Sequence, residues 1–192
     1  MPMIRETIVS TMDDAGAAHF APLGIIADGD GWIIAPFHPS TTLDNLRSVP
    51  FAVANFSDDV RVFAGCLTGR RRWPTAACEE IQVPRLAGAL AHAELKVTHV
   101  SEDAQRPRFH CRVLRNVVHA PFRGFNRAQA AVIEAAILVS RLGMLPRDKV
   151  EREMAYLEIA VSKTASAAEQ EAWTWLKDAI SAFYAKPANN NV

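Results

Sequence analysis

The spacing of apolar residues changes once along the chain, and this change constrains the fold more than any other feature. Up to about residue 118 the apolar residues form short runs or alternate with polar ones, as in 92–100 and 109–118. Such a period of two is typical of β-strands. Two of the runs are separated by Asp-Gly pairs at 28–31, which favour tight turns because glycine adopts positive φ angles without steric cost. The first part of the chain is therefore predicted to form six or so mostly antiparallel strands.

Helical signals interrupt this part twice and dominate the last third. Thr41 followed by Asp44 is a capping-box pattern, and Ser57 followed by two aspartates indicates the start of a second short helix. From Asn126 onward apolar residues recur with helical spacing in three segments, the last of which begins at a capping box, 166–169. An antiparallel sheet of this size needs closure or cover for its edges. We therefore expect an α+β protein with a small barrel, two short interleaved helices and a C-terminal helical bundle.

The composition excludes several classes of protein. Lysine plus arginine and aspartate plus glutamate both number 21, so the formal net charge is zero, which argues against binding nucleic acid or an anionic membrane through overall charge. The three cysteines have no C-x-x-C spacing, so neither a disulfide framework nor a zinc ribbon is indicated. The first residues lack the basic and apolar runs of a signal peptide, and polar residues interrupt the most apolar stretches. We expect a cytoplasmic protein that does not enter a membrane.

The sharpest candidate for a binding site is the hydroxyl run Ser40, Thr41 and Thr42 at the start of a predicted helix. Helix N-termini present unpaired N–H groups and the positive end of the helix dipole, and neighbouring hydroxyls add donors for a phosphate or carboxylate. The alternative is that Thr41 only caps the helix while the other two hydroxyls face water.

Two further sets of residues extend this candidate. One consists of polar residues that could widen a pocket, although each could also satisfy a nearby backbone group: Ser10, Thr11, Asn45 and Asn55. The other is a strand segment that contains a proline and a glycine: Pro22, Leu23, Gly24 and Ile25. Its proline marks a strand edge or bulge, and its glycine lets a flat ligand approach the backbone. The same segment could equally be a bulge that closes a barrel.

Other chemistry has little support in the sequence. The six histidines lack H-x-H, H-x-x-x-H and H-E-x-x-H spacing, so we expect no metal site. The motifs of serine hydrolases, P-loop NTPases and dinucleotide-binding folds are absent. His38, beside the hydroxyl run, is the one nearby candidate for a general acid. The run 70–72, three arginines in a stretch without clear period, is interpreted as a solvated loop or an intersubunit contact rather than a nucleic-acid site.

Several segments in a fixed order resemble the DUF447 family of FMN-binding split-barrel proteins. Those of the first part are Glu6-Thr7-Ile8-Val9-Ser10-Thr11, Ala21-Pro22-Leu23-Gly24-Ile25, Pro36-Phe37, 40–46 and 55–59. Those of the last third are 122–128, 131–135 and Ser140-Arg141. Together they cover most of the chain. The stretch 65–84 departs from the family pattern.

The resemblance implies a split-barrel flavin-binding domain at 1–122 and a helical appendage at 123–192 packed on the barrel. It also implies a homodimer with FMN at the subunit interface. Ser40, Thr41, Thr42 and Asn45 would then hold the phosphate, while the segment 22–25, with Ser10 and Thr11 on the neighbouring strand and Asn55 nearby, would lie along the ring and ribityl chain. Arg123 or Arg127 would add charge to the phosphate from the partner subunit.

Family resemblance does not define a reaction. The function that it implies is a flavin-dependent oxidoreductase acting on a small molecule, with a link to methanopterin and one-carbon metabolism. The alternative is a non-catalytic flavin-binding or assembly module, because no constellation of acid, base and nucleophile is recognisable in the sequence.

Overall fold

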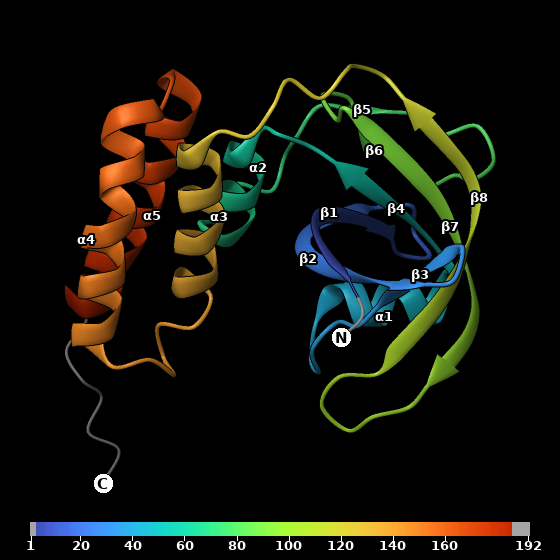
Figure 1. Cartoon of the computed structure of the whole chain (residues 1–192). Helices are drawn as coiled ribbons and strands as arrows, with labels where there is room; N and C mark the ends of the chain where they lie inside the picture. Colours follow the sequence, from blue (N-terminus) through green and yellow to red (C-terminus); the bar gives the residue numbers. More distant parts are fainter. Residues whose placement is uncertain (1–2, 186–192) are drawn as a thin grey trace, which may run out of the picture. The chain divides into compact units, whose positions relative to one another are not determined.

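A computed structural model describes residues 3–185 of the chain. The chain forms two compact units, one of residues 3–58 and 71–122 and the other of residues 59–70 and 123–185. The first unit contains the strands and one helix, and the second contains the remaining helices (Figure 1). The expected α+β class and antiparallel barrel are confirmed.

Six strands close into an antiparallel barrel in the order β1-β2-β3-β8-β7-β4. Their bounds are Ile4–Met12 for β1, Ala18–Asp28 for β2, Gly31–Ile34 for β3, Phe51–Phe56 for β4, Ala91–Ser101 for β7 and Arg108–Val118 for β8. The helix α1, Thr41–Ser48, lies between β3 and β4 in the chain, and the short strands β5, Thr75–Ala76, and β6, Arg85–Leu86, pair with each other. Closure of the barrel gives each of the six strands two neighbours, as the sequence-based expectation required, although within the described part of the chain residues 18–25 of β2 have a partner strand on one edge only.

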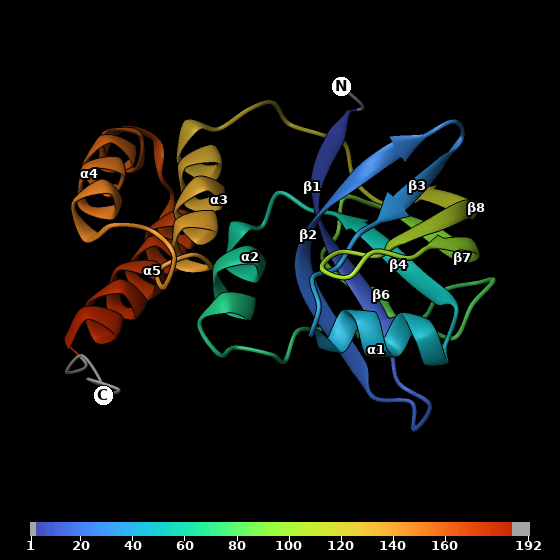
Figure 2. The same cartoon turned by 90° about the horizontal axis from the view of Figure 1, so that it is seen from below.

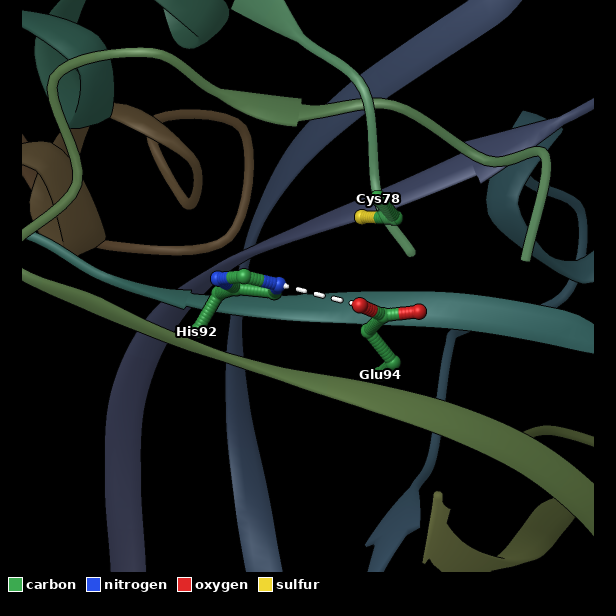
Figure 3. A group of neighbouring side chains, drawn as sticks. All are labelled: Cys78, His92 and Glu94. Carbon is green, nitrogen blue, oxygen red and sulfur yellow. Dashed lines mark hydrogen bonds and ion pairs between the residues drawn. The ribbon is translucent and has the colours of Figure 1, made fainter. Parts of the chain in front are cut away.

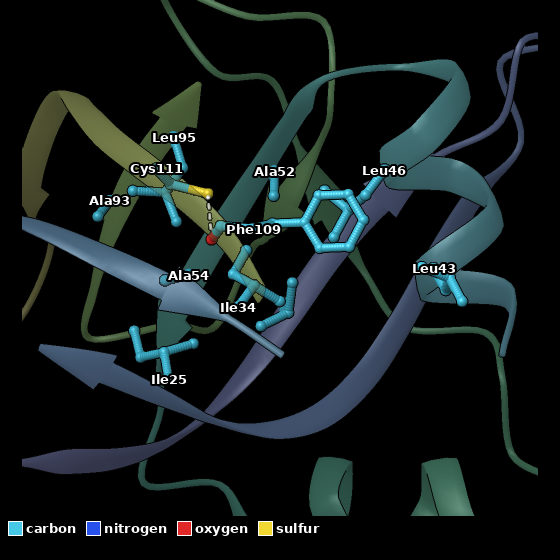
Figure 4. Packing of buried hydrophobic residues seen from close by; sticks show 11 residues of the cluster. Ile25, Ile34, Leu43, Leu46, Ala52, Ala54, Ala93, Leu95, Phe109 and Cys111 are labelled. Atoms are coloured by element: carbon cyan, nitrogen blue, oxygen red, sulfur yellow. Dashed lines mark hydrogen bonds between the residues drawn. The ribbon is translucent and has the colours of Figure 1, made fainter. Parts of the chain in front are cut away.

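The barrel core contains side chains that alternate along the strands, together with two leucines from α1 (Figure 4). Phe109, Ile34 and Leu95 are among its largest buried residues, and Leu43 and Leu46 anchor α1 to it. Because successive strand residues point to opposite faces, the neighbours of these core residues face outward. On β4 and β7 that outer face is also covered, since Val53 packs against residues of the segment 77–83.

The cap of α1 differs from the expectation. Ser40 is the N-cap residue, and its Oγ accepts a hydrogen bond from the backbone N–H of Leu43 at 3.3 Å. Thr41 is already the first helical residue. Thr41 therefore does not serve as the cap that the capping-box pattern with Asp44 predicted, because the residue before it supplies the oxygen.

The second unit consists of four helices: α2, Val60–Leu67; α3, Arg127–Val139; α4, Arg147–Thr164; and α5, Ala167–Ala185 (Figure 2). Small side chains allow close packing of α2 and α3, and Trp173 of α5 fills the centre of this core. Asn126 caps α3 as expected, accepting a hydrogen bond from Ala128 N at 2.7 Å. The boundary between the units lies after Phe122, but the domain inferred at 1–122 included residues 59–70, which the structure groups with the helices because Val60 and Ala64 are buried in the helical core.

Candidate functional site

The N-terminus of α1 offers donors that the protein does not use itself. The first backbone N–H groups of a helix have no partner within the helix, and here these belong to Thr41 and Thr42. Thr41 is exposed and Thr42 is buried, and neither hydroxyl makes a hydrogen bond to another residue in the described part of the chain. Ser40 differs, because its hydroxyl is engaged in capping. The end of α1 can therefore donate several hydrogen bonds to an anion.

Asn45 and Thr11 hold this helix against the barrel. The Nδ2 atom of Asn45 donates to Thr11 Oγ1 at 3.0 Å, and both side chains are at most 5 % exposed. Thr11 has the same orientation on β1 as Val9, which belongs to the barrel core. The bond therefore joins α1 to the core-facing side of β1. It positions the helix end and leaves Asn45 and Thr11 little surface for a ligand.

Asn55 joins three strands on the other face of the barrel wall. Its Nδ2 donates to Ile8 O and to Ser10 Oγ, both at 2.8 Å, and its Oδ1 accepts from the backbone N–H of Leu86 on β6, also at 2.8 Å. Asn55 and Ser10 are completely buried. Ser10 and Thr11 thus point to opposite faces of β1 and do not line one common pocket.

The strand segment with the proline and glycine lies on β2 next to β1, in the register Pro22 with Ile8 and Leu23 with Thr7. The pairing of β2 with β3 covers only residues 26–28. Among the described residues, 18–25 therefore have a partner strand on one edge only. Pro22, Leu23 and Gly24 are partly exposed, whereas Ile25 is buried in the core.

Packing against β1 explains why position 24 is a glycine. A Cβ atom built there would lie 2.8 Å from Ile4 Cγ2 and 3.2 Å from Glu6 Oε1. Both atoms belong to side chains of β1 that lie over the glycine. The close approach expected at this position is thus made within the chain, by the side chains of Ile4 and Glu6 on the neighbouring strand β1.

Three other candidates are exposed. His38 precedes α1, Arg123 lies in the helical unit, and Arg70 stacks on the ring of Trp175 at 4.0 Å to the ring centroid. The contact of Arg70 accounts for the first arginine of the run. Participation of Arg123 in a phosphate site stays a prediction.

A cluster that spacing did not reveal lies on the outer face of β7 (Figure 3). One donor atom from each of Cys78, His92 and Glu94 lies within 4.8 Å of the others. His92 and Glu94 are two residues apart on one strand, a pattern that puts both on one face. Cys78 comes from the stretch between β5 and β6, which had no readable period. The one sequence signal that could have indicated this cluster is the His-x-Glu pair, His92 and Glu94, in a strand that alternates apolar and polar residues.

The electrostatics of this cluster follow from its burial. Burial lowers the pKa of His92, against the opposing effect of Glu94. Burial by itself would raise the pKa of Glu94, but hydrogen bonds from the backbone of Glu79 and Glu80 and from His92 outweigh it, and the pKa is lowered. Burial and the charge of Glu94 raise the pKa of the Cys78 thiol to about 11.

A pocket of about 900 Å³ opens beside this cluster. It is lined by residues 12–16, Val49, Phe51 and 77–83, so that Cys78 belongs to its wall. None of the cofactor-binding residues inferred from the sequence lines it. Within residues 3–185, no helix has the length and hydrophobicity required to cross a membrane.

Fold and site together define a class: a six-stranded antiparallel barrel with a donor-rich helix end at its side and a separate helical unit. Residues 5–120 match the N-terminal domain model of a protein family of unknown function, DUF447, and residues 126–178 match the second model of that family. The chain belongs to the DUF447 family. No match to a curated protein was found.

Solved structures share this fold. The chain is similar to an FMN-bound DUF447 protein of Methanosarcina mazei, with 22 % identity, a TM-score of 0.82 and coverage of 93 % of this chain and 96 % of that one. It is also similar to an FMN-binding protein of Thermus thermophilus solved with p-hydroxybenzaldehyde, with 18 % identity, a TM-score of 0.53 and coverage of 62 % and 73 %. A third is 2-nitrobenzoate 2-nitroreductase of Pseudomonas fluorescens, with 19 % identity, a TM-score of 0.52 and coverage of 62 % and 66 %.

Replacement of Asn55 by alanine is expected to destabilise the barrel by about 1–3 kcal/mol, because the buried N–H of Leu86 and the hydroxyl of Ser10 lose their partner. Urea unfolding measures the change, and hydrogen exchange at the Leu86 amide should accelerate. The matched control is Asn116→Ala on the exposed surface of β8, which should leave stability within about 0.5 kcal/mol. Equal stability of both variants would contradict the role assigned to Asn55.

Proposed function

We propose that the protein is an FMN-binding flavoprotein and acts as a flavin-dependent oxidoreductase on a small molecule. The observation that carries this proposal is the likeness to the FMN-bound DUF447 protein, which extends over 93 % of this chain. When bound, FMN supplies the hydride and single-electron chemistry, so the residues of the protein need only bind, orient and shield it.

The end of α1 suits the phosphate of FMN. A phosphate dianion requires several donors. The exposed hydroxyl of Thr41 and the first N–H groups of the helix have no other use in the described structure and could supply them. The formal net charge of the chain is zero, so this attraction has to come from the local dipole and the hydrogen bonds. Ser40 contributes indirectly by fixing the first turn.

The segment 22–25 suits the flat ring. Its backbone lies on a strand with one unpaired edge, and Pro22 and Leu23 are partly exposed. Ile25 and Leu43 belong to the same core cluster, which places this strand beside α1. Phosphate and ring would therefore be held by neighbouring elements, and Ser10, Thr11, Asn45 and Asn55 would support these elements from within the barrel.

Two finer parts of the proposal have narrower support. A pterin-type substrate linked to methanopterin metabolism is supported by the family resemblance alone. A homodimer with FMN at its interface is supported by the unpaired edge of β2, which a second copy could cover, and by partly or fully exposed apolar side chains of the barrel unit such as Ile4 and Phe37.

Replacement of Thr41, the exposed threonine of the first turn, by valine is expected to weaken FMN binding by roughly 10- to 100-fold, since a hydrogen bond to a charged group contributes about 1.5–3 kcal/mol. Flavin fluorescence titration of the apoprotein measures the affinity. Riboflavin, which lacks the phosphate, should bind the variant and the parent equally. Thr75→Val, at an exposed threonine of β5, is the matched control. An equal loss for riboflavin would show that the variant damages the ring site or the fold instead.

The bound flavin is expected to lose its visible absorbance when NADH or NADPH is added without oxygen, and to regain it with an electron acceptor. Stopped-flow absorbance measures both steps. Bound flavin that neither nucleotide reduces would favour the alternative, a flavin-binding module without turnover, and a protein that takes up no FMN would contradict the flavoprotein proposal itself.

The FMN-loaded protein is expected to be a dimer in light scattering, with twice the chain mass of 21.1 kDa. Substitution of Ile4 by lysine, at an exposed apolar position of β1, should shift the protein toward the monomer, because a charge would be buried in the interface without a partner. A monomer that binds FMN fully would contradict an interfacial site.

A further inference from the structure

Three donors of different chemical type meet on the outer side of the barrel wall. Cys78 offers sulfur, His92 a ring nitrogen and Glu94 a carboxylate oxygen, all within 4.8 Å of one another (Figure 3). Sulfur, imidazole and carboxylate together match the ligand preference of zinc rather than that of magnesium or calcium, which take oxygen ligands. The donor set thus favours zinc.

The separation of the His92 and Glu94 donors fits two ligands of a tetrahedral ion. His92 Nε2 and Glu94 Oε1 are 3.4 Å apart, a hydrogen bond at the long end of the range. Zinc ligands lie ~2.0–2.3 Å from the metal, so two ligand atoms of a tetrahedral site are about 3.3–3.7 Å apart. The observed separation equals such an edge.

Both buried ligands are held in place by neighbours. The second ring nitrogen of His92, Nδ1, lies 2.9 Å from Nε2 of His119, and the two rings stack. The backbone N–H groups of Glu79 and Glu80 donate to the two oxygens of Glu94 at 3.0 and 2.8 Å. Such outer contacts are typical of metal ligands, whose orientation and basicity they set. Glu94 is fully buried and His92 is 3 % exposed.

The pairing of β7 with β8 is irregular at this point. The register shifts directly after Glu94, where Leu114 of β8 is skipped, and irregularities of this kind are frequent next to functional sites. Ala93 and Leu95 belong to the barrel core, so the two ligands of β7 point outward, beneath the segment that carries Cys78.

The charges in the site would balance. A thiolate and a carboxylate neutralise a dication, and the imidazole is neutral. The neighbouring cation Arg85, which acts on both Cys78 and His92, would then face a site without net charge. Cys78 also lines the pocket of about 900 Å³, so the fourth position of the ion is available to water or to a ligand from the pocket, as in zinc sites with three protein ligands.

We propose that Cys78, His92 and Glu94 bind a zinc ion with one position open to the adjacent pocket. The site uses none of the residues assigned to FMN. A failure of the flavin proposal would therefore not affect the zinc proposal, nor the reverse. The competing interpretation is that Glu94 only anchors the loop at residues 79–80, and the experiment distinguishes the two.

The test uses the full chain, purified without a histidine tag and stripped of metal by a chelator. Titration with Co²⁺ alone is expected to give a thiolate-to-cobalt charge-transfer band in the near ultraviolet and the visible bands of tetrahedral cobalt. Added Zn²⁺ should displace the bound Co²⁺ and remove these bands, with a stoichiometry of one ion per chain. Cys78→Ser should abolish the charge-transfer band. Cys66→Ser, at the other partly buried cysteine, which lies in the helical unit, should leave it unchanged.

A third variant tests the outer contact. His119→Gln is expected to weaken Co²⁺ binding by roughly 10- to 100-fold while the band persists at saturation. Circular dichroism should show the Cys78→Ser and His119→Gln variants folded. Absence of the band in the parent protein, or a band that survives Cys78→Ser, would overturn the proposal and leave Glu94 as a loop anchor.

Discussion

Polar groups in the barrel wall have to find partners within the protein where β4 and the first part of β7, up to Leu95, are buried on both faces. The inner face contributes Ala54 and Leu95 to the core, and the outer face is covered by the segment 77–86, which includes β6. An unpaired polar group there would cost about 1–3 kcal/mol. Asn55 and Glu94 meet this requirement by binding backbone N–H groups of the covering segment. The covering segment and the barrel wall therefore stabilise each other.

The strand and helix pattern could be predicted from the sequence because it depends on local periodicity. The alternating stretches around 92–100 and 109–118 became β7 and β8, and Asn126 became the cap of α3. Residues 59–70 show the limit of that reasoning. The start of a helix was readable there, but its assignment to the helical unit depends on the burial of Val60 and Ala64 against helices that follow much later in the chain.

The candidate sites also differ in how far local sequence predicts them. The donor-rich end of α1 was visible in three consecutive residues, although the capping oxygen came from Ser40 rather than Thr41. Ser10 and Thr11 looked like one polar group in the sequence, yet the period of two puts them on opposite faces of β1. Cys78 could not be connected with His92 by spacing, because the two meet only when the covering segment folds over β7.

The two proposed sites place opposite demands on a chain whose formal net charge is zero. A phosphate at α1 depends on dipoles and hydroxyls, which attract an anion only if the helix is held in a fixed orientation, and Leu43 with the Asn45 to Thr11 bond provides that anchoring from the core side of the wall. A dication at Glu94 depends on ligand charge on the outer side. Because alternation along the strands separates these two sides, one barrel can hold an anion and a cation without a shared residue and without an overall charge of either sign.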